Sequence, residues 1–474
     1  MRNRSLTRGF SRLLAVLLAL SLVAAACGDD DDTTADSTAD STADTGGDGS
    51  ETPAADDDTG DAADDAAGDD TADGTETPAA DDSGDTTEPA GDPEPTNGFD
   101  GETIKLGYLT DQSGALSIVG NPLLAGAQAY WDYVNDELGG VAGRYKVELV
   151  TGDTKDDEAA TVQEYQRIRE DVVMVAEVLS TPPTQAVLEF LEEDGIIAVP
   201  GSLAAQWNKE ANLLPNGAAY EFEMINLADW FVNESGLGSA DSVACVVYVN
   251  DIYGENTLRG LEHAAAELGF EIAVSETIGR GDTDFTAQIT ALNDGGCEVV
   301  YAITLPSEQN AMLAAANSQG FEPVWLGALP SYINLLAAGN QDLYTNMYVA
   351  LDTPSFLDTD VPGMVDFLDR WGAYGSGDPN TFHLSGYFQS IAVHALLEKA
   401  VSMGDLSHEG LQAALADLGE VELDGLADNY VYGTPENREP ASASRIFHFD
   451  PEGGPNLMTQ VAQVDSALIE SFEY

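Results

Sequence analysis

The chain has 474 residues, and its 17 basic and 84 acidic side chains give a formal net charge of −67. A chain of this length has room for two or three domains. So strong a negative charge excludes binding to nucleic acid or to an anionic membrane surface through electrostatic attraction.

The acidic residues are spread unevenly along the chain. Residues 28–100 contain 26 acidic side chains and neither lysine nor arginine. Residues 101–474 keep 58 acidic and 13 basic side chains. One interpretation is an ordinary solvated surface, and the other is adaptation to high salt, which screens the repulsion between like charges. A melting temperature that does not rise with salt would count against the second interpretation.

The first 26 residues have the pattern of a signal peptide. Four arginines lie within residues 1–12, and residues 13–26 form an apolar run that is too short for a stable membrane span. The run ends in three alanines followed by Cys27. Residues 22–27 resemble a bacterial lipobox, in which the cysteine becomes the lipid-bearing N-terminus after cleavage. The alternative is an ordinary small-residue cleavage site, and we predict lipid attachment at Cys27.

The predicted lipidated cysteine opens a low-complexity segment, residues 27–100. Asp, Thr, Ala, Gly, Ser, Glu and Pro dominate it, and no Leu, Ile, Val, Tyr or Trp occurs between Gly28 and Thr96. Such a segment cannot bury enough apolar surface to fold. We predict a disordered acidic spacer with an r.m.s. span of roughly 45–50 Å.

From Ile104 onward, short apolar runs alternate with stretches that have apolar residues at helical spacing. This pattern predicts alternating strands and helices, in one series before Tyr220 and a second after it. Repeated βα units imply parallel sheets with helices on both faces, so we predict an α/β fold with two doubly wound lobes. The predicted strands are 104–109, 145–150, 172–178, 196–199, 243–249, 271–278, 297–303 and 323–327, and helices are predicted from Asn121, over 156–171, 184–194, 285–293 and 307–320, and before Gly269.

Ligands of doubly wound folds lie at the carboxyl ends of the strands. Gln112 and Ser113 follow the first predicted strand, where the alternative is an ordinary turn. Thr181 and Thr184 lie between the third strand and the start of a helix, where free backbone N–H groups favour an anion. The alternative for Thr184 is simple helix capping.

No catalytic motif is present. The sequence lacks GxGxxG after the first strand, a P-loop, GxSxG and HExxH, and its five histidines have no metal-ligand spacing. We therefore predict that the protein is not an enzyme and has no catalytic residues, no metal ion and no cofactor.

Cys245 and Cys297 lie at or near the starts of two strands of the second series. In a sheet of order 2-1-3 these strands are neighbours, and the predicted compartment is oxidising, so a disulfide is one interpretation. The other is a pair of small buried residues.

Residues 102–474 resemble the branched-chain amino acid (Leu/Ile/Val)-binding proteins of ABC transporters, which have the type I periplasmic-binding fold. Five motifs carry the resemblance in order: IKLGYLTDQSG from residue 104, LSTPPTQA from 179, AVPGS from 198, NDIYGENT from 250 and GDTDFTAQITAL from 281. The resemblance implies two lobes that are joined by three crossovers and close on a ligand in the cleft between them. The implied boundaries are 102–222 plus 353–431 for lobe 1 and 223–352 plus 432–474 for lobe 2.

The resemblance also implies ligand contacts. Thr181, with Ser180 beside it, corresponds to the hydroxyl that binds a ligand carboxylate. Gly201 and Ser202 correspond to the next backbone and side-chain contacts, and Tyr253 corresponds to the cleft tyrosine of the second lobe.

The acid that pairs with the ligand's ammonium group in this family aligns near an apolar residue, Leu329. An ammonium group buried without a partner costs roughly a few kcal/mol. The sequence therefore disfavours an ordinary α-amino acid ligand, unless another acid such as Glu221 or Glu308 compensates.

These features predict an extracytoplasmic solute-binding lipoprotein of an ABC uptake transporter, anchored by lipid to the outer face of the bacterial cytoplasmic membrane. Its expected partners are an ABC permease and a small polar ligand, which is an amino acid or a related carboxylate or amide. We expect a monomer that does not bind nucleic acid. The alternatives are a ligand-sensing lipoprotein of the same fold and a secreted enzyme, which the missing catalytic motifs disfavour.

Overall fold

The computed structural model describes residues 91–474. The signal peptide predicted for residues 1–26, the lipid attachment predicted at Cys27 and most of the predicted spacer lie outside the described residues. Within the described part, no helix is both long enough and apolar enough to cross a membrane.

The folded part begins earlier than the boundary predicted at residue 100. Thr96 and Phe99 form a bridge, and Phe99 also bridges to Ile104 at the start of the first strand. The Phe99 side chain is 2% exposed and packs edge-on against Tyr145, with ring centroids 5.1 Å apart. The predicted spacer therefore ends before Thr96, because this single aromatic side chain belongs to the core.

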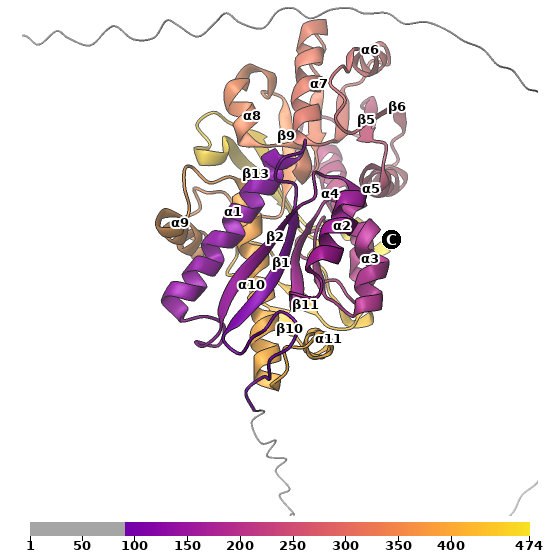
Figure 1. Ribbon diagram of the computed structural model, residues 1–474. Helices are drawn as coiled ribbons and strands as arrows, with labels where there is room; N and C mark the ends of the chain where they lie inside the picture. The colour runs from indigo at the N-terminus through magenta and orange to yellow at the C-terminus, as the bar shows by residue number, and fades with distance from the viewer. Residues whose placement is uncertain (1–90) are drawn as a thin grey trace, which may run out of the picture. The chain divides into compact units, whose positions relative to one another are not determined.

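The first lobe is built on a four-stranded parallel sheet of order β2-β1-β3-β4 (Figure 1). The inner strand β3 is buried at every residue, and five of its six residues are apolar, as is typical of a strand with helices on both faces. The strands are β1 (Thr103–Thr110), β2 (Lys146–Asp153), β3 (Met174–Leu179) and β4 (Ala198–Gly201).

Helices cover both faces of this sheet. Helices α1 and α10 pack on each other over one face, and α2 and α3 pack over the other (Figure 1). The helices are α1 (Ser117–Tyr133), continued by the π-helix η1 (Val134–Leu138), α2 (Glu158–Ile168), α3 (Thr181–Asp194), η2 (Ala205–Lys209), α9 (Pro362–Tyr374), α10 (Thr381–Met403) and α11 (His408–Ala416), and a small antiparallel pair, β10 (Gly419–Val421) and β11 (Tyr430–Tyr432), completes the lobe.

Helix α1 begins at Ser117, about one turn before the start predicted at Asn121. The buried Asp111 carboxylate accepts hydrogen bonds from three backbone N–H groups of the loop between β1 and α1. These bonds fix the loop ahead of the helix, so the Asn-Pro pair lies inside α1 and does not start it.

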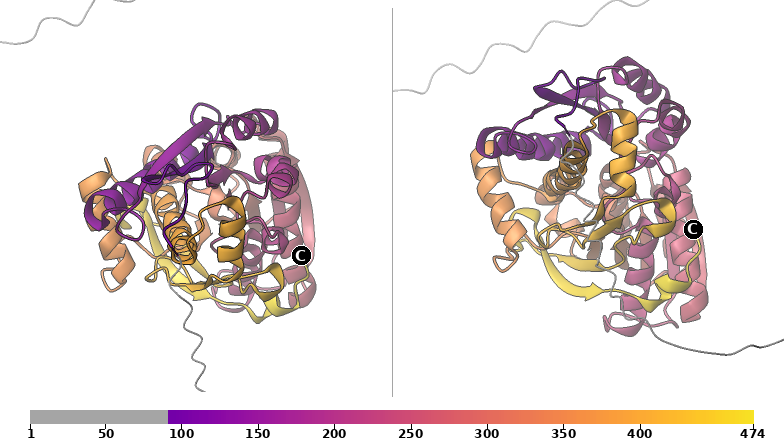
Figure 2. Two further views of the ribbon diagram at one scale, coloured as in Figure 1. Left: turned by 60° about the horizontal axis from the view of Figure 1, so that its bottom comes forward. Right: turned by 90° about the horizontal axis from the view of Figure 1, so that it is seen from below.

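The second lobe has a seven-stranded sheet of order β13-β12-β9-β8-β7-β5-β6. Its last two strands run antiparallel to their neighbours and lie at one edge of the sheet, drawn in yellow in Figure 2. The sheet is therefore mixed, and not wholly parallel as predicted. The strands are β5 (Ala244–Val249), β6 (Ile272–Ile278), β7 (Val299–Ile303), β8 (Val324–Gly327), β9 (Met347–Leu351), β12 (Ser444–Phe449) and β13 (Met458–Val464).

The helices of the second lobe complete a hydrophobic core that continues across the interface to a few side chains of the first lobe, among them Leu116, Leu179 and Phe382. These helices are α4 (Tyr220–Asn233), α5 (Ile252–Leu268), α6 (Thr286–Asp294), α7 (Pro306–Gln319) and α8 (Asn334–Gly339), with short 3₁₀ turns η3 (Leu329–Ser331), η4 (Gln341–Leu343), η6 (Gly454–Asn456) and η7 (Ala467–Ser471). A further turn, η5 (Pro435–Asn437), lies at the third crossover and contacts η2 of the first lobe.

The chain passes between the lobes three times: between β4 and α4, between β9 and α9, and between β11 and β12. The predicted fold class, an α/β protein with two lobes joined by three crossovers, is confirmed. The antiparallel edge of the second sheet is the part of the architecture that the βα repeat did not indicate.

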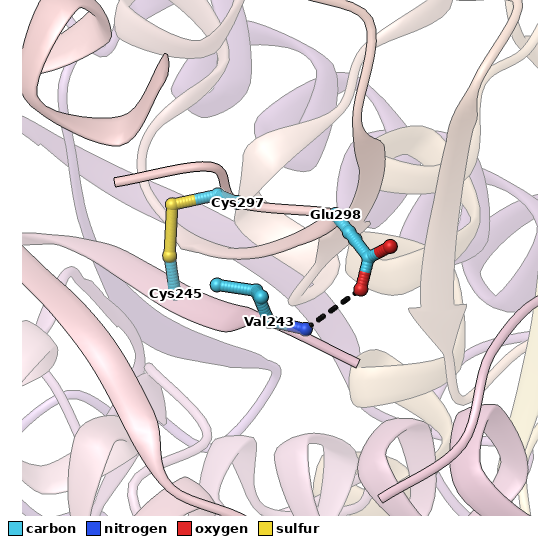
Figure 3. Close-up of a disulfide and its surroundings, with 4 residues drawn as sticks. All are labelled: Val243, Cys245, Cys297 and Glu298. Atoms are coloured by element: carbon cyan, nitrogen blue, oxygen red, sulfur yellow. Dashed lines mark hydrogen bonds between the residues drawn. A yellow bond between two sulfur atoms is a disulfide. The ribbon is translucent and has the colours of Figure 1, made fainter. Parts of the chain in front are cut away.

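A disulfide joins Cys245 at the start of β5 to Cys297, which precedes β7 (Figure 3). The two strands are neighbours because β5 lies between β6 and β7. Beside the disulfide, the Val243 N–H donates to the Glu298 carboxylate over 2.9 Å. The disulfide and this hydrogen bond tie together the ends of two adjacent parallel strands.

Candidate functional site: a cavity between the lobes

A cavity with an empty volume of about 640 Å³, part of it open to solvent, lies between the two lobes. Most of its lining is apolar. The first lobe contributes Leu116, Val119, Leu123, Leu179, Phe382 and Phe388, and the second contributes Leu305, Leu329 and Pro330.

Three hydroxyl groups lie together where β3 and β4 end. The Thr181 and Ser202 hydroxyls are 2.7 Å apart, and the Trp207 indole N–H donates to Ser202 over 3.0 Å. Ser180, the residue before α3, has a φ of +84°, an uncommon value for a residue with a side chain. All three hydroxyl residues line the cavity, as expected because ligands of doubly wound folds lie at the carboxyl ends of the strands.

The N-terminus of α3 is poor in hydrogen-bond donors. Thr181 is followed by Pro182 and Pro183, which have no backbone N–H. The N–H of Thr184 already donates to the Ser180 carbonyl. Of the free N–H groups that normally let a helix start bind an anion, this helix keeps only the one on Thr181.

Gly201 ends β4 in the lining of the cavity. A Cβ at this position would overlap the carboxyl group of Glu177, which projects from the neighbouring strand β3. Glu177 is fully buried, and burial raises its pKa well above the ordinary value. Glycine is required at position 201 because the Glu177 side chain occupies the adjacent space.

Two tyrosines form the aromatic side of the cavity. Tyr253 and Tyr220 both line it, and their rings pack edge-on with centroids 5.1 Å apart. The Tyr253 hydroxyl donates to the Thr304 carbonyl over 3.3 Å, which fixes the ring. Sequence reasoning found Tyr253 but missed Tyr220, the first residue of α4.

The structure places Gln112 and Ser113 outside the lining of the cavity. The Ser113 hydroxyl donates to Asp153 over 2.6 Å, and the Gln112 N–H donates to the same carboxylate over 2.9 Å. These bonds hold the loop after β1 against the end of β2. That loop reaches the cavity through Leu116 instead.

An ion-pair cluster joins the lobes beside the cavity. Arg280 of the second lobe lines the cavity, and its guanidinium lies 2.6 Å from Asp156 of the first lobe and 2.5 Å from Asp251 of its own lobe. Burial raises the pKa of Asp156, although Arg280 and the Ser180 hydroxyl act to lower it. The cluster holds the two lobes in contact at this edge.

The acids considered as replacements at Leu329 are engaged elsewhere. Glu221 accepts the Ala205 N–H over 3.0 Å, and Glu308 accepts the Gly281 N–H over 2.8 Å. A different acid, Glu223, accepts the Leu329 N–H itself over 3.0 Å. Burial raises the pKa of Glu223 well above its ordinary value, which disfavours the charged form of this group.

Asp352 brings a carboxylate into the cavity lining, and sequence reasoning missed it. It follows the last residue of β9 at the second crossover, is 3% exposed, and its Oδ1 has no hydrogen-bond partner in the described part of the chain. Burial raises its pKa to about 6, against the lowering effect of Arg445. Thr181 was found because it follows a predicted strand. Asp352 also follows a strand, but β9 was not predicted, so the same reasoning did not reach it.

Comparison with known proteins identifies the family. The family model described as periplasmic binding protein matches residues 103–455, most of the described part. The chain belongs to the periplasmic binding protein family. The resemblance to branched-chain amino acid binding proteins is thereby confirmed, and members of this family bind solutes and are not enzymes.

The curated relatives of this family share little sequence identity with this chain. A leucine-, isoleucine-, valine-, threonine- and alanine-binding protein of Pseudomonas aeruginosa is 24% identical over 204 residues, which cover 42% of this chain and 53% of the relative. The chain thus spans about half the length of the curated relatives it matches.

Solved structures share the fold over more of the chain. A fatty acid ABC transporter substrate-binding protein from Thermomonospora curvata has a TM-score of 0.74 at 24% identity, covering 80% of this chain and 96% of that one. A branched-chain amino acid ABC transporter protein from Thermus thermophilus with bound valine has a TM-score of 0.67 at 18% identity, covering 78% and 98%. These likenesses show the fold and leave the ligand open.

Proposed function

We propose that the protein is the solute-binding component of an ABC uptake system and traps a small amphipathic molecule between its lobes. The cavity built from both lobes and bordered by the ion pair between Asp156 and Arg280 carries this proposal. In such a protein the bound ligand favours the closed arrangement through its contacts with both lobes. No covalent chemistry is involved.

The proposed ligand has an apolar body and a small polar end. Aliphatic and aromatic side chains make up most of the lining, which modifies the small polar ligand expected from the sequence. The named ligands of the relatives, branched-chain amino acids and fatty acids, have this same division. We assign contacts with the polar groups to Ser180, Thr181, Gly201, Ser202 and Tyr253.

Binding is tested by thermal unfolding of the purified protein against amino acids, amides, short-chain and long-chain carboxylates and amines. A ligand at 100 times its dissociation constant is expected to stabilise the protein by about 2.7 kcal/mol, which raises the melting temperature measurably. If no compound of these classes changes the melting temperature, the solute-binding proposal is contradicted.

The membrane anchor is a separate part of the proposal. Lipid at Cys27 would hold the protein at the outer face of the cytoplasmic membrane, where a permease accepts the ligand. In the native host, Cys27→Ala is expected to release the protein from the membrane fraction and to lower ligand uptake. Release without any loss of uptake would favour the sensing alternative.

A further inference from the structure

The polar atoms of the cavity that lack partners are hydrogen-bond acceptors. Asp352 Oδ1 and Gln389 Oε1 are buried and have no hydrogen-bond partner among residues 91–474. Both residues line the cavity, Asp352 from the second crossover and Gln389 from α10. A buried carboxylate oxygen without a donor is destabilising, so the two acceptors favour a ligand that brings N–H groups.

The charges around the cavity favour a cation over an anion. Arg280 is the sole cationic residue in the lining formed by the described residues, and two aspartates already bind its guanidinium. Arg445 is the cation that acts on Asp352, and its guanidinium lies 3.7 Å from Asp428 and donates to the backbone carbonyl of Asp352. Arg445 thus acts on the Asp352 carboxylate from nearby, but in the described part of the chain no salt bridge joins this carboxylate to a cation.

The start of α3, where an anion would be expected to bind, has few hydrogen-bond donors. Pro182 and Pro183 remove two N–H donors from the start of α3, and the Thr181 and Ser202 hydroxyls bond to each other. A carboxylate ligand would meet one backbone N–H and the hydroxyl groups there, with no free cation beside them. The cavity therefore offers few hydrogen-bond donors to an anion, whereas its acceptors on Asp352 and Gln389 are unpaired.

We propose, on the basis of the solute-binding function above, that Asp352 with Gln389 selects ligands that carry an amine on an apolar body. Asp352 takes the role of the acid that is absent at Leu329, from a different strand of the second lobe. A free carboxylate on the ligand is not required.

The test compares head groups on one carbon skeleton, using isothermal titration of the full-length protein above pH 7. Leucine, 3-methylbutylamine, 4-methylpentanoate and 4-methylpentanamide form one set, and phenylalanine, 2-phenylethylamine and 3-phenylpropanoate form a second. The amine-bearing members are expected to bind about tenfold or more tightly than the carboxylates without an amine, because only they pair with the buried charge.

Substitution identifies the residue responsible. Asp352→Asn is expected to weaken binding of the amines by about 30-fold or more and to leave the amine-free members unchanged or tighter. Gln389→Leu tests the second acceptor from a separate helix, should Asp352→Asn fail to fold. The matched control is Asp342→Asn, which removes one negative charge from an exposed position of the same lobe.

Preferred binding of the carboxylates, or an amine preference that survives both Asp352→Asn and Gln389→Leu, would overturn this inference and leave solute binding intact. Binding of no compound from either set would also overturn it, and the broader panel then decides the solute-binding proposal by itself.

Discussion

Replacing both Cys245 and Cys297 by serine is expected to lower the free energy of unfolding by about 4 kcal/mol. The disulfide closes a loop of 52 residues that holds α5, β6 and α6. Closing a loop of that length removes conformational entropy from the unfolded chain, and the loss of this constraint accounts for the expected value. Urea unfolding of the wild type and the double variant measures the difference.

The control for this experiment is Cys27→Ser, which removes the remaining cysteine and leaves the described fold unchanged. A thiol titration of the unfolded, unreduced protein is expected to detect no thiol from Cys245 or Cys297. A double variant as stable as the wild type would contradict the stabilising role of the disulfide, and two titratable thiols at these positions would show that the disulfide is absent.

Adding a methyl group between α1 and α10 is expected to destabilise the first lobe by roughly 2–4 kcal/mol, since overpacking strains a close backbone contact. A Cβ at Gly126 would overlap the His383 carbonyl oxygen, and a Cβ at Gly386 would overlap the Leu123 carbonyl oxygen. The two glycines thus let the helices approach at two successive points. Thermal unfolding of Gly126→Ala and Gly386→Ala tests this.

Gly372→Ala is the matched control, because a Cβ there, on the exposed side of α9, meets no neighbouring atom. It is expected to raise stability by about 0.5–1 kcal/mol, since alanine favours a helix over glycine. Equal effects of all three substitutions would show that close packing of α1 and α10 is not what the glycines provide.

The sequence predicted the elements whose pattern is local. Strands such as β1 and β5 are short apolar runs, and their bounds agree with prediction to within about two residues. Helix α10 was not predicted: it is apolar on nearly all sides, because α1, α11 and the cavity surround it, and so it lacks an amphipathic stripe. The antiparallel edge strand β13, in which exposed residues alternate with buried or half-buried ones, was also missed.

In the candidate site, too, only the residues with a local sequence pattern were predicted. Ser180, Thr181 and Tyr253 lie in recognisable motifs after predicted strands, and they line the cavity. Asp352 and Gln389 lie in segments without a motif and reach the cavity only through the crossovers and the packing of α10. Their role depends on long-range topology, which neither periodicity nor motif spacing indicates.

The most direct test of the account is to fill the cavity and measure binding. Ser385 on α10 lines the cavity, and Ser402 on the same helix is exposed, with each hydroxyl bonded to a carbonyl of its own helix. For the tightest ligand of the panel, isothermal titration is predicted to show binding lost in Ser385→Phe and unchanged in Ser402→Phe. Unchanged affinity in a folded Ser385→Phe protein would contradict the assignment of this cavity as the ligand site.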